Sequence, residues 1–163
     1  MPLGRRRFER ARDGSVLVRL PARERELLRS LPAQLRELLD EDDPALERLF
    51  PPAYPGDEEA DEEFGRLTRR ELVAGKHRAL AVVEETAGAE RLDDEQLAAW
   101  VGALNDLRLV LGTRLGVTED LYATVPSPRD PRAPELALFG YLTWLQEQAV
   151  QVLAGGLHDR TSR

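Results

Sequence analysis

The chain has 163 residues, a net charge of −7 and an isoelectric point near 5.0. This length is typical of one domain with a substantial hydrophobic core. The sequence has no cysteine, which excludes disulfides, thiolate nucleophiles and cysteine-ligated zinc within these residues. No run approaches the roughly 20 apolar residues of a membrane-spanning helix. Because no apolar run follows the basic amino terminus, no secretory signal is predicted and we expect a cytoplasmic protein.

The hydrophobic pattern predicts a mostly α-helical fold, a bundle of about four long helices with a short N-terminal β-hairpin. One domain is expected over residues 1–156. The hairpin is expected over 8–20, because Asp13-Gly14 is a strong turn signal and apolar residues alternate after it. Apolar residues at helical spacing predict the long helices, which are expected over 22–40, 69–87, 94–115 and 134–154.

Several residues suggest where these helices begin, bend and end. Pro32 is expected to kink or restart the first helix, with Ser30 as a local cap. Asp93 followed by Gln96 forms a predicted capping box. Gly116 can take the left-handed conformation that ends a helix.

The remaining segments are predicted to be irregular. Residues 41–66 combine several prolines with an acidic run, so no helix is expected in the proline-rich part. A short helix is expected after Thr118, followed by a proline-rich linker over 126–134. Gly155-Gly156 is predicted to end the last helix, leaving a disordered tail over 157–163.

Arg108 lies near the centre of the apolar arc of the predicted helix 94–115. An unpaired buried guanidinium costs several kcal/mol, so a carboxylate should meet it. The pattern favours Glu147, with Glu84 next, while Asn105 lies one turn earlier and Asp106 is expected to face solvent. Two interpretations remain open: a structural ion pair that sets helix register, or a cluster of Arg108, Asn105 and Glu147 that binds a small anion or a partner's carboxylate.

No arrangement of residues predicts catalysis. Lys76, the only lysine, is expected to extend along an apolar face rather than act as a catalytic amine. His77 and His158 have no carboxylate at metal-ligand spacing. A phosphate-binding glycine loop and a nucleophile-elbow serine are also lacking. The sequence therefore predicts no catalytic residue, cofactor or metal, and Trp100 and Trp144 are expected to be core or dimer contacts.

Charge is distributed unevenly along the chain. Residues 40–63 hold eleven acids against Arg48 alone. The amino terminus is basic instead, which suits a protein partner, self-association or DNA, although a solvated arm is the simplest interpretation. The arginines of this candidate interaction arm are Arg5, Arg6, Arg7, Arg10 and Arg12.

The segment from Leu104 to Leu115, with its Asn-Asp-Leu-Arg sequence, resembles an actinobacterial family of unknown function often encoded beside the ClpS protease adaptor. The resemblance extends to residues 48–55, 83–86 and 141–147. Some members are described as oxidative-stress transcriptional regulators (AosR-like) that work with an alternative sigma factor and sense oxidants through a cysteine pair. This sequence lacks cysteine, so the resemblance implies a regulatory or scaffold role without that sensing chemistry.

Three functions follow as hypotheses. The first is a non-enzymatic regulator that acts through a protein partner such as a sigma factor, transcription machinery or proteolysis machinery. A homodimer of this chain is an additional hypothesis. The second is a DNA-binding regulator that uses the basic arm, which the net negative charge disfavours because phosphates repel it. The third is a small-anion binder or enzyme centred on Arg108. No membrane partner is expected.

Overall fold

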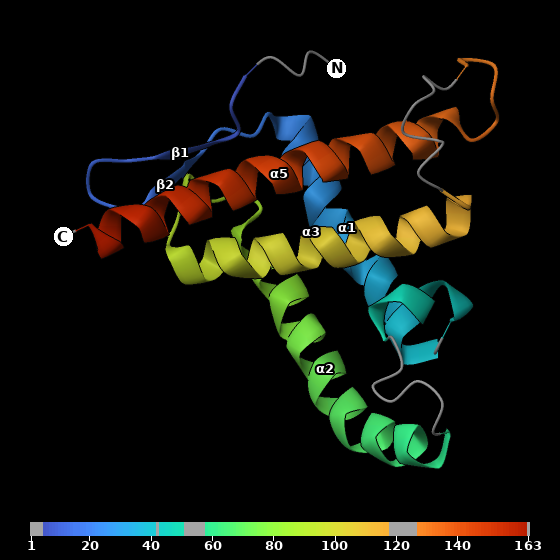
Figure 1. Ribbon diagram of the computed structural model, residues 1–163. Helices are drawn as coiled ribbons and strands as arrows, with labels where there is room; N and C mark the ends of the chain where they lie inside the picture. Colours follow the sequence, from blue (N-terminus) through green and yellow to red (C-terminus); the bar gives the residue numbers. More distant parts are fainter. Residues whose placement is uncertain (1–4, 42, 51–57, 118–126, 163) are drawn as a thin grey trace.

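In the computed structural model the described residues are 5–41, 43–50, 58–117 and 127–162. They form a mostly helical fold with a small sheet near the amino terminus (Figure 1). The predicted fold class, about four long helices with an N-terminal hairpin, is confirmed. The elements are β1 (Phe8–Arg10), β2 (Val16–Val18), α1 (Ala22–Glu41), the 3-10 helix η1 (Pro44–Leu49), α2 (Glu58–Thr86), β3 (Arg91–Leu92), α3 (Asp94–Leu115) and α5 (Ala133–Thr161).

The predicted hairpin pairs β1 with β2 in antiparallel register, with Phe8 opposite Val18. Its turn contains Gly14 at a φ of 89°, a conformation that glycine adopts without steric cost. The short strand β3 pairs with the other side of β2, with Val16 opposite Leu92. The sheet order is therefore β1-β2-β3, which makes β1 an edge strand. The sequence pattern did not predict β3, because two residues carry no periodicity.

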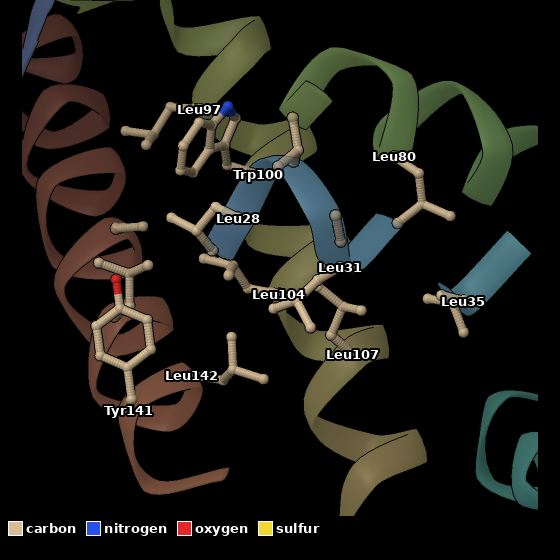
Figure 2. Packing of buried hydrophobic residues seen from close by; sticks show 14 of the residues in the cluster. Leu28, Leu31, Leu35, Leu80, Leu97, Trp100, Leu104, Leu107, Tyr141 and Leu142 are labelled. Atoms are coloured by element: carbon tan, nitrogen blue, oxygen red, sulfur yellow. The ribbon is translucent and has the colours of Figure 1, made fainter. Parts of the chain in front are cut away.

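The core gathers apolar side chains from every long helix (Figure 2). Trp100 on α3 is fully buried, meets Phe8 of β1 edge-on at 6.0 Å between ring centroids, and donates its indole N–H to the Thr86 hydroxyl at 2.7 Å. Each fully buried large apolar side chain contributes about 1.5–3 kcal/mol. The expectation that Trp100 is a core residue is confirmed.

The helices differ in how much of their length they bury. In Figure 1, α3 and α5 run side by side, and α1 crosses behind them. α2 begins far from this group and reaches it in its carboxyl-terminal half. Its fully buried residues accordingly start at Leu80 and continue with Val83, whereas the described positions from 65 to 79 include none.

The expected restart of the first helix at Pro32 is wrong. α1 is continuous from Ala22 to Glu41, and the Ser30 hydroxyl donates backwards to the Leu27 carbonyl at 2.8 Å instead of capping a new helix. Pro32 itself is buried with the leucines before and after it. We infer that their burial outweighs the ~3 kcal/mol that an interior proline costs.

The second long helix begins at Glu58, eleven positions before the predicted start, so part of the expected irregular segment is helical. Acidic residues in a first turn interact favourably with the helix dipole, and no proline interrupts the segment. η1 also lies in the expected irregular region, where the Asp43 carboxylate caps it by accepting from the Ala45 N–H. The proline-rich residues 51–57 and the short helix expected after Thr118 lie outside the described residues.

The last helix continues through Gly155-Gly156 to Thr161, so the disordered tail expected over 157–163 is wrong for residues 157–161. Gly156 accommodates a neighbour instead of ending the helix, because a Cβ built there would clash with the guanidinium of Arg10. The capping box of α3 and its left-handed end at Gly116 are confirmed.

Candidate functional site

The predicted basic arm is partly built into the fold. Arg7 is only 6% exposed and forms a two-pronged ion pair with Glu24 of α1, in which Nε and Nη2 each donate to a carboxylate oxygen at 2.9 Å. The Tyr141 hydroxyl of α5 donates to the same carboxylate at 2.9 Å. The Arg7 guanidinium also lies 5.2 Å from the centre of the Trp144 ring. We call Arg7, Glu24, Tyr141 and Trp144 the Arg7 network.

The Arg7 network leaves few polar groups unmet. The Glu24 carboxylate raises the pKa of Arg7 through their hydrogen bond. Burial, followed by the bond to Glu24, raises the pKa of the Tyr141 phenol, which keeps its proton as a donor. A forked guanidinium suits this geometry because it matches both carboxylate oxygens. The network connects α1 and α5 to the chain at β1, so its role is structural. Arg7 is therefore fixed in the fold and is not part of a mobile arm.

Arg10 is also fixed. Its guanidinium pairs with Asp94 and donates to the carbonyls of Gly14 and Val152. Its Nε is buried without a hydrogen-bond partner among the described residues.

Arg5, Arg6 and Arg12 are exposed. The prediction that all five arginines form one interaction arm is therefore wrong. Three of them face solvent, whereas Arg7 and Arg10 connect the hairpin to the helices.

The structure places Arg108 differently from the expectation. It is half-buried, and Nη2 donates to the Asn105 side-chain oxygen at 3.1 Å. Its Nε is buried without a partner in the described part of the chain. Glu147 is exposed on α5 and forms no ion pair with Arg108, whereas Glu84 pairs with Arg36. The predicted carboxylate partners are therefore wrong, and of the candidate cluster only Arg108 and Asn105 come together.

Asp106 is the buried carboxylate of α3, which corrects the expectation that it faces solvent. It is 7% exposed and accepts two hydrogen bonds from Lys76 Nζ at 3.0 and 3.1 Å. Burial raises the pKa of Asp106, and the nearby ammonium offsets only part of this rise. Lys76 therefore ends on a carboxylate instead of extending to solvent.

The helical phase explains why sequence reasoning missed this pair. α3 contacts α5, α2, α1 and η1, so its buried surface covers more than the single apolar arc on which Arg108 lies. Asp106 and Val110, on the side away from Arg108, are both buried. The sequence feature that could have predicted the burial of Asp106 is the run from Ala103 to Val110. Its apolar residues lie around most of the helix, so few positions can face solvent.

A groove of about 680 Å³ lies between the edge strand β1 and the carboxyl-terminal half of α5, and we call it the β1–α5 groove. Phe8, Gly155 and Gly156 are among its lining residues, and Arg10 occupies the space that a side chain at Gly156 would fill. Its polar lining consists of Arg6, Glu9, Arg10, Gln148, Gln151 and His158.

These arrangements define a helical domain whose buried ion pairs connect its elements and which has a groove with polar and apolar lining residues between β1 and α5. The chain belongs to the family described as "Domain of unknown function (DUF2017)", whose model matches residues 5–153. It is similar to the oxidative stress regulator AosR of Mycobacterium tuberculosis, with 33% identity over 130 residues, covering 69% of this chain and 59% of that protein. It is also similar to the putative oxidative stress regulator AosR of Mycobacterium leprae, with 30% identity over 129 residues and the same coverage.

The chain thus spans less than two thirds of the length of these relatives. No solved structure matches it. None of the helices searched, which comprise the described residues, is long and apolar enough to span a membrane.

Proposed function

We propose that the chain is a non-enzymatic regulatory protein that acts in the cytoplasm by binding a protein partner in the β1–α5 groove. The observation that carries this proposal is the groove itself, which lies beside the edge strand of the sheet. An edge strand presents backbone N–H and C=O groups that an extended segment can pair with. β1 and α5 would form the two walls around such a segment.

The polar lining favours a particular kind of segment. Arg6 and His158 are exposed at the groove, and Glu9 is engaged by Arg19 at 3.0 Å. The accessible lining is thus neutral to basic, which suits a neutral or acidic peptide. Gln151 adds a side-chain amide that can donate and accept hydrogen bonds, whereas the Gln148 side-chain oxygen already accepts the Arg7 backbone N–H at 2.7 Å, which leaves its N–H groups as donors.

The other polar clusters favour binding over catalysis. In the Arg7 network and the Lys76–Asp106 pair, the charged groups are directed at one another and join separate elements. A catalytic site needs such groups to face a substrate. This supports a protein without enzymatic activity.

The named relatives favour a stress-linked role, because they are described as oxidative stress regulators. The partner would then belong to transcription machinery, including a sigma factor, or to proteolysis machinery. Since these 163 residues contain no cysteine, the chain would act downstream of an oxidant signal that another component receives.

Affinity capture from the native cytoplasm tests the groove. Gln151→Trp places a large side chain in the groove, and Ala154→Trp is the matched control at an exposed α5 position outside its lining. We expect the wild type and Ala154→Trp to retain the same partner and Gln151→Trp to lose it. Equal retention by all three proteins, or no specific retention by the wild type, would overturn the proposal.

A second candidate function is a small-anion binder at Arg108, favoured by its buried Nε without a partner among the described residues. A phosphate or carboxylate ligand would then raise the melting temperature of the wild type but not of Arg108→Ala.

The DNA-binding alternative is weaker, because Arg7 and Arg10 have internal partners. It predicts a salt-dependent mobility shift that substitution of Arg5, Arg6 and Arg12 abolishes.

A further inference from the structure

We infer that the outer surface of the α3–α5 layer pairs with the same surface of a second copy of the chain. α3 and α5 run side by side, and α1 crosses behind them (Figure 1). Of the α3 positions from 96 to 113, only Ala98 and Gly102 are exposed. Both lie about 200° around the helix from the buried Trp100. Helix surfaces that face water are normally polar, so this one is better suited to contact another protein.

α5 continues the same surface. Val150 and Leu157, which are 43% and 57% exposed, are two of the three exposed large hydrophobic side chains in the described part of the chain. Gly140 and Ala154 are exposed at the same helical spacing. Glu147 is the only ionisable residue among the exposed positions from 136 to 157. We define the α3–α5 face as Ala98, Gly102 and Arg108 of α3 with Gly140, Glu147, Val150, Ala154 and Leu157 of α5.

This face carries two opposite charges that form no ion pair among the described residues. Arg108 is half-buried, its Nη2 donates to the neutral Asn105 side chain, and its Nε is buried without a hydrogen-bond partner. Glu147 is exposed on the neighbouring helix. A guanidinium that is partly removed from water is stabilised by a carboxylate. Each copy therefore offers one base and one acid, and the face is complementary in charge to itself.

The antiparallel course of α3 and α5 (Figure 1) brings the two charges to similar heights. Gly112 of α3 marks the level of Phe139 of α5, because a Cβ built there would lie 3.0 Å from that ring. Counting from this contact places Arg108 level with position 143, about 6 Å or one turn from Glu147. In a two-fold pair whose axis runs along the helices, α3 of each copy covers α5 of the other. Arg108 of each copy then comes within side-chain reach of Glu147 of the other copy.

The size of the face also fits a second copy. Two adjacent helices that share an exposed stripe of about 18 residues present roughly 500 Å² per copy, or about 1,000 Å² in total. This area is the lower end of the range for specific interfaces and is typical of a weak dimer. A two-fold dimer uses one patch on both subunits, so one Arg108–Glu147 contact in the sequence is made twice.

Charge exchange between two variants tests this pairing. Arg108→Glu places an acid opposite Glu147 of the other copy, and Glu147→Arg places a base opposite Arg108, so each variant alone opposes like charges. An equimolar mixture of the two restores opposite charges at both contacts. The control, Glu37→Arg, makes the same change as Glu147→Arg at an exposed position of α1. Circular dichroism establishes that each protein is folded, and sedimentation equilibrium at several concentrations gives its molar mass.

We expect the wild type and Glu37→Arg to dimerise equally well. Each charge variant alone should dimerise at least about tenfold more weakly, and the mixture should recover a heterodimer. Val150→Glu buries an unpaired acid in the same face, so it should also weaken the dimer and does not depend on the folding of Arg108→Glu. A wild type that stays monomeric at about millimolar concentration would overturn the inference. So would a dimer that neither Glu147→Arg nor Val150→Glu weakens, or folded charge variants whose mixture does not associate.

The pairing goes beyond the proposed function and is tested independently of it. Glu147 does not line the β1–α5 groove, so Glu147→Arg should lose the dimer and still retain the partner captured in that groove. Because Arg108 and Glu147 meet only between copies, they should couple in dimerisation and not in the unfolding of the monomer at low concentration.

Discussion

Two ion pairs buried in the described part of the chain show how differently a fold can accommodate charge. In the Arg7 network a forked guanidinium meets both oxygens of Glu24, and Tyr141 adds a third donor to the same carboxylate. In the other pair a single ammonium, that of Lys76, serves both oxygens of Asp106. The pKa of Asp106 is raised mainly by burial. A buried carboxylate is thus compensated more fully by several directed donors than by one point charge.

The largest expected effect is at Glu24. Glu24→Ala should lower the free energy of unfolding by about 3–5 kcal/mol, because it leaves the Arg7 guanidinium buried without its carboxylate. Urea denaturation monitored by circular dichroism measures this loss. Glu26→Ala, at an exposed position of the same helix, should change stability by no more than about 0.5 kcal/mol. Equal losses in the two variants would show that the Arg7 network carries no special share of stability.

Asp106→Ala should cost less, about 1.5–3 kcal/mol, the range for hydrogen bonds to charged groups. The Lys76 side chain is already 18% exposed, so it can turn its ammonium toward water once the carboxylate is gone. Replacing both residues, Lys76→Met with Asp106→Leu, should recover much of this loss. A double variant less stable than Asp106→Ala would contradict the interpretation that the Lys76 ammonium offsets only part of the cost of burying the Asp106 carboxylate. Glu95→Ala on the exposed side of α3 is the control.

Arg108 extends the comparison to a cation with a neutral partner. Arg108→Ala should cost about 0.5–1.5 kcal/mol, the range for one ordinary hydrogen bond. Asn105→Ala should couple to it in a double-mutant cycle, whereas Glu147→Ala should add independently within about 0.5 kcal/mol. Chemical denaturation of the single and double variants decides this. A loss near 4 kcal/mol with strong coupling to Glu147 would restore the ion pair that the helical pattern suggests.

The smallest expected effect is on the pH dependence of stability. Because the pKa of Asp106 is raised, the folded chain retains this proton at pH values where the unfolded chain has released it. Stability from this group is therefore present at low pH and lost as pH rises from the ordinary aspartate value of 3.8 through the folded value. The stability of the wild type relative to Asp106→Asn should accordingly be greater at about pH 4 than at about pH 7.

Asp130 provides a control of opposite sign. Hydrogen bonds from Arg132 lower the pKa of this partly exposed carboxyl group, so its small contribution is present at neutral pH and lost as pH falls. The stability of the wild type relative to Asp130→Asn should therefore decrease toward low pH. Urea denaturation at a series of pH values measures both trends, and the same sign for both variants would contradict the assignments.

Local pattern located the four long helices, although it missed the start of α2 and the end of α5, and it did not predict the polar contacts. The capping box at Asp93 and the turn at Gly14 are set by neighbouring residues, and both are present. The Arg7 network joins residues up to 137 positions apart, from Arg7 to Trp144, and no periodicity links Arg7 to Tyr141. The helical phase of Asp106 was misjudged because an apolar arc identifies the buried side only for a helix covered from one direction.

The contact of Arg10 with Val152 and Gly156 of α5 affects how the molecule opens. Arg10 donates to the Val152 carbonyl and occupies the space that a side chain at Gly156 would fill. β1 is thereby fastened to the carboxyl-terminal part of α5. Transient opening of the hairpin and fraying of the last turns of α5 should occur as one cooperative event. Amide hydrogens after residue 156 should then exchange at the same rate as those of β1.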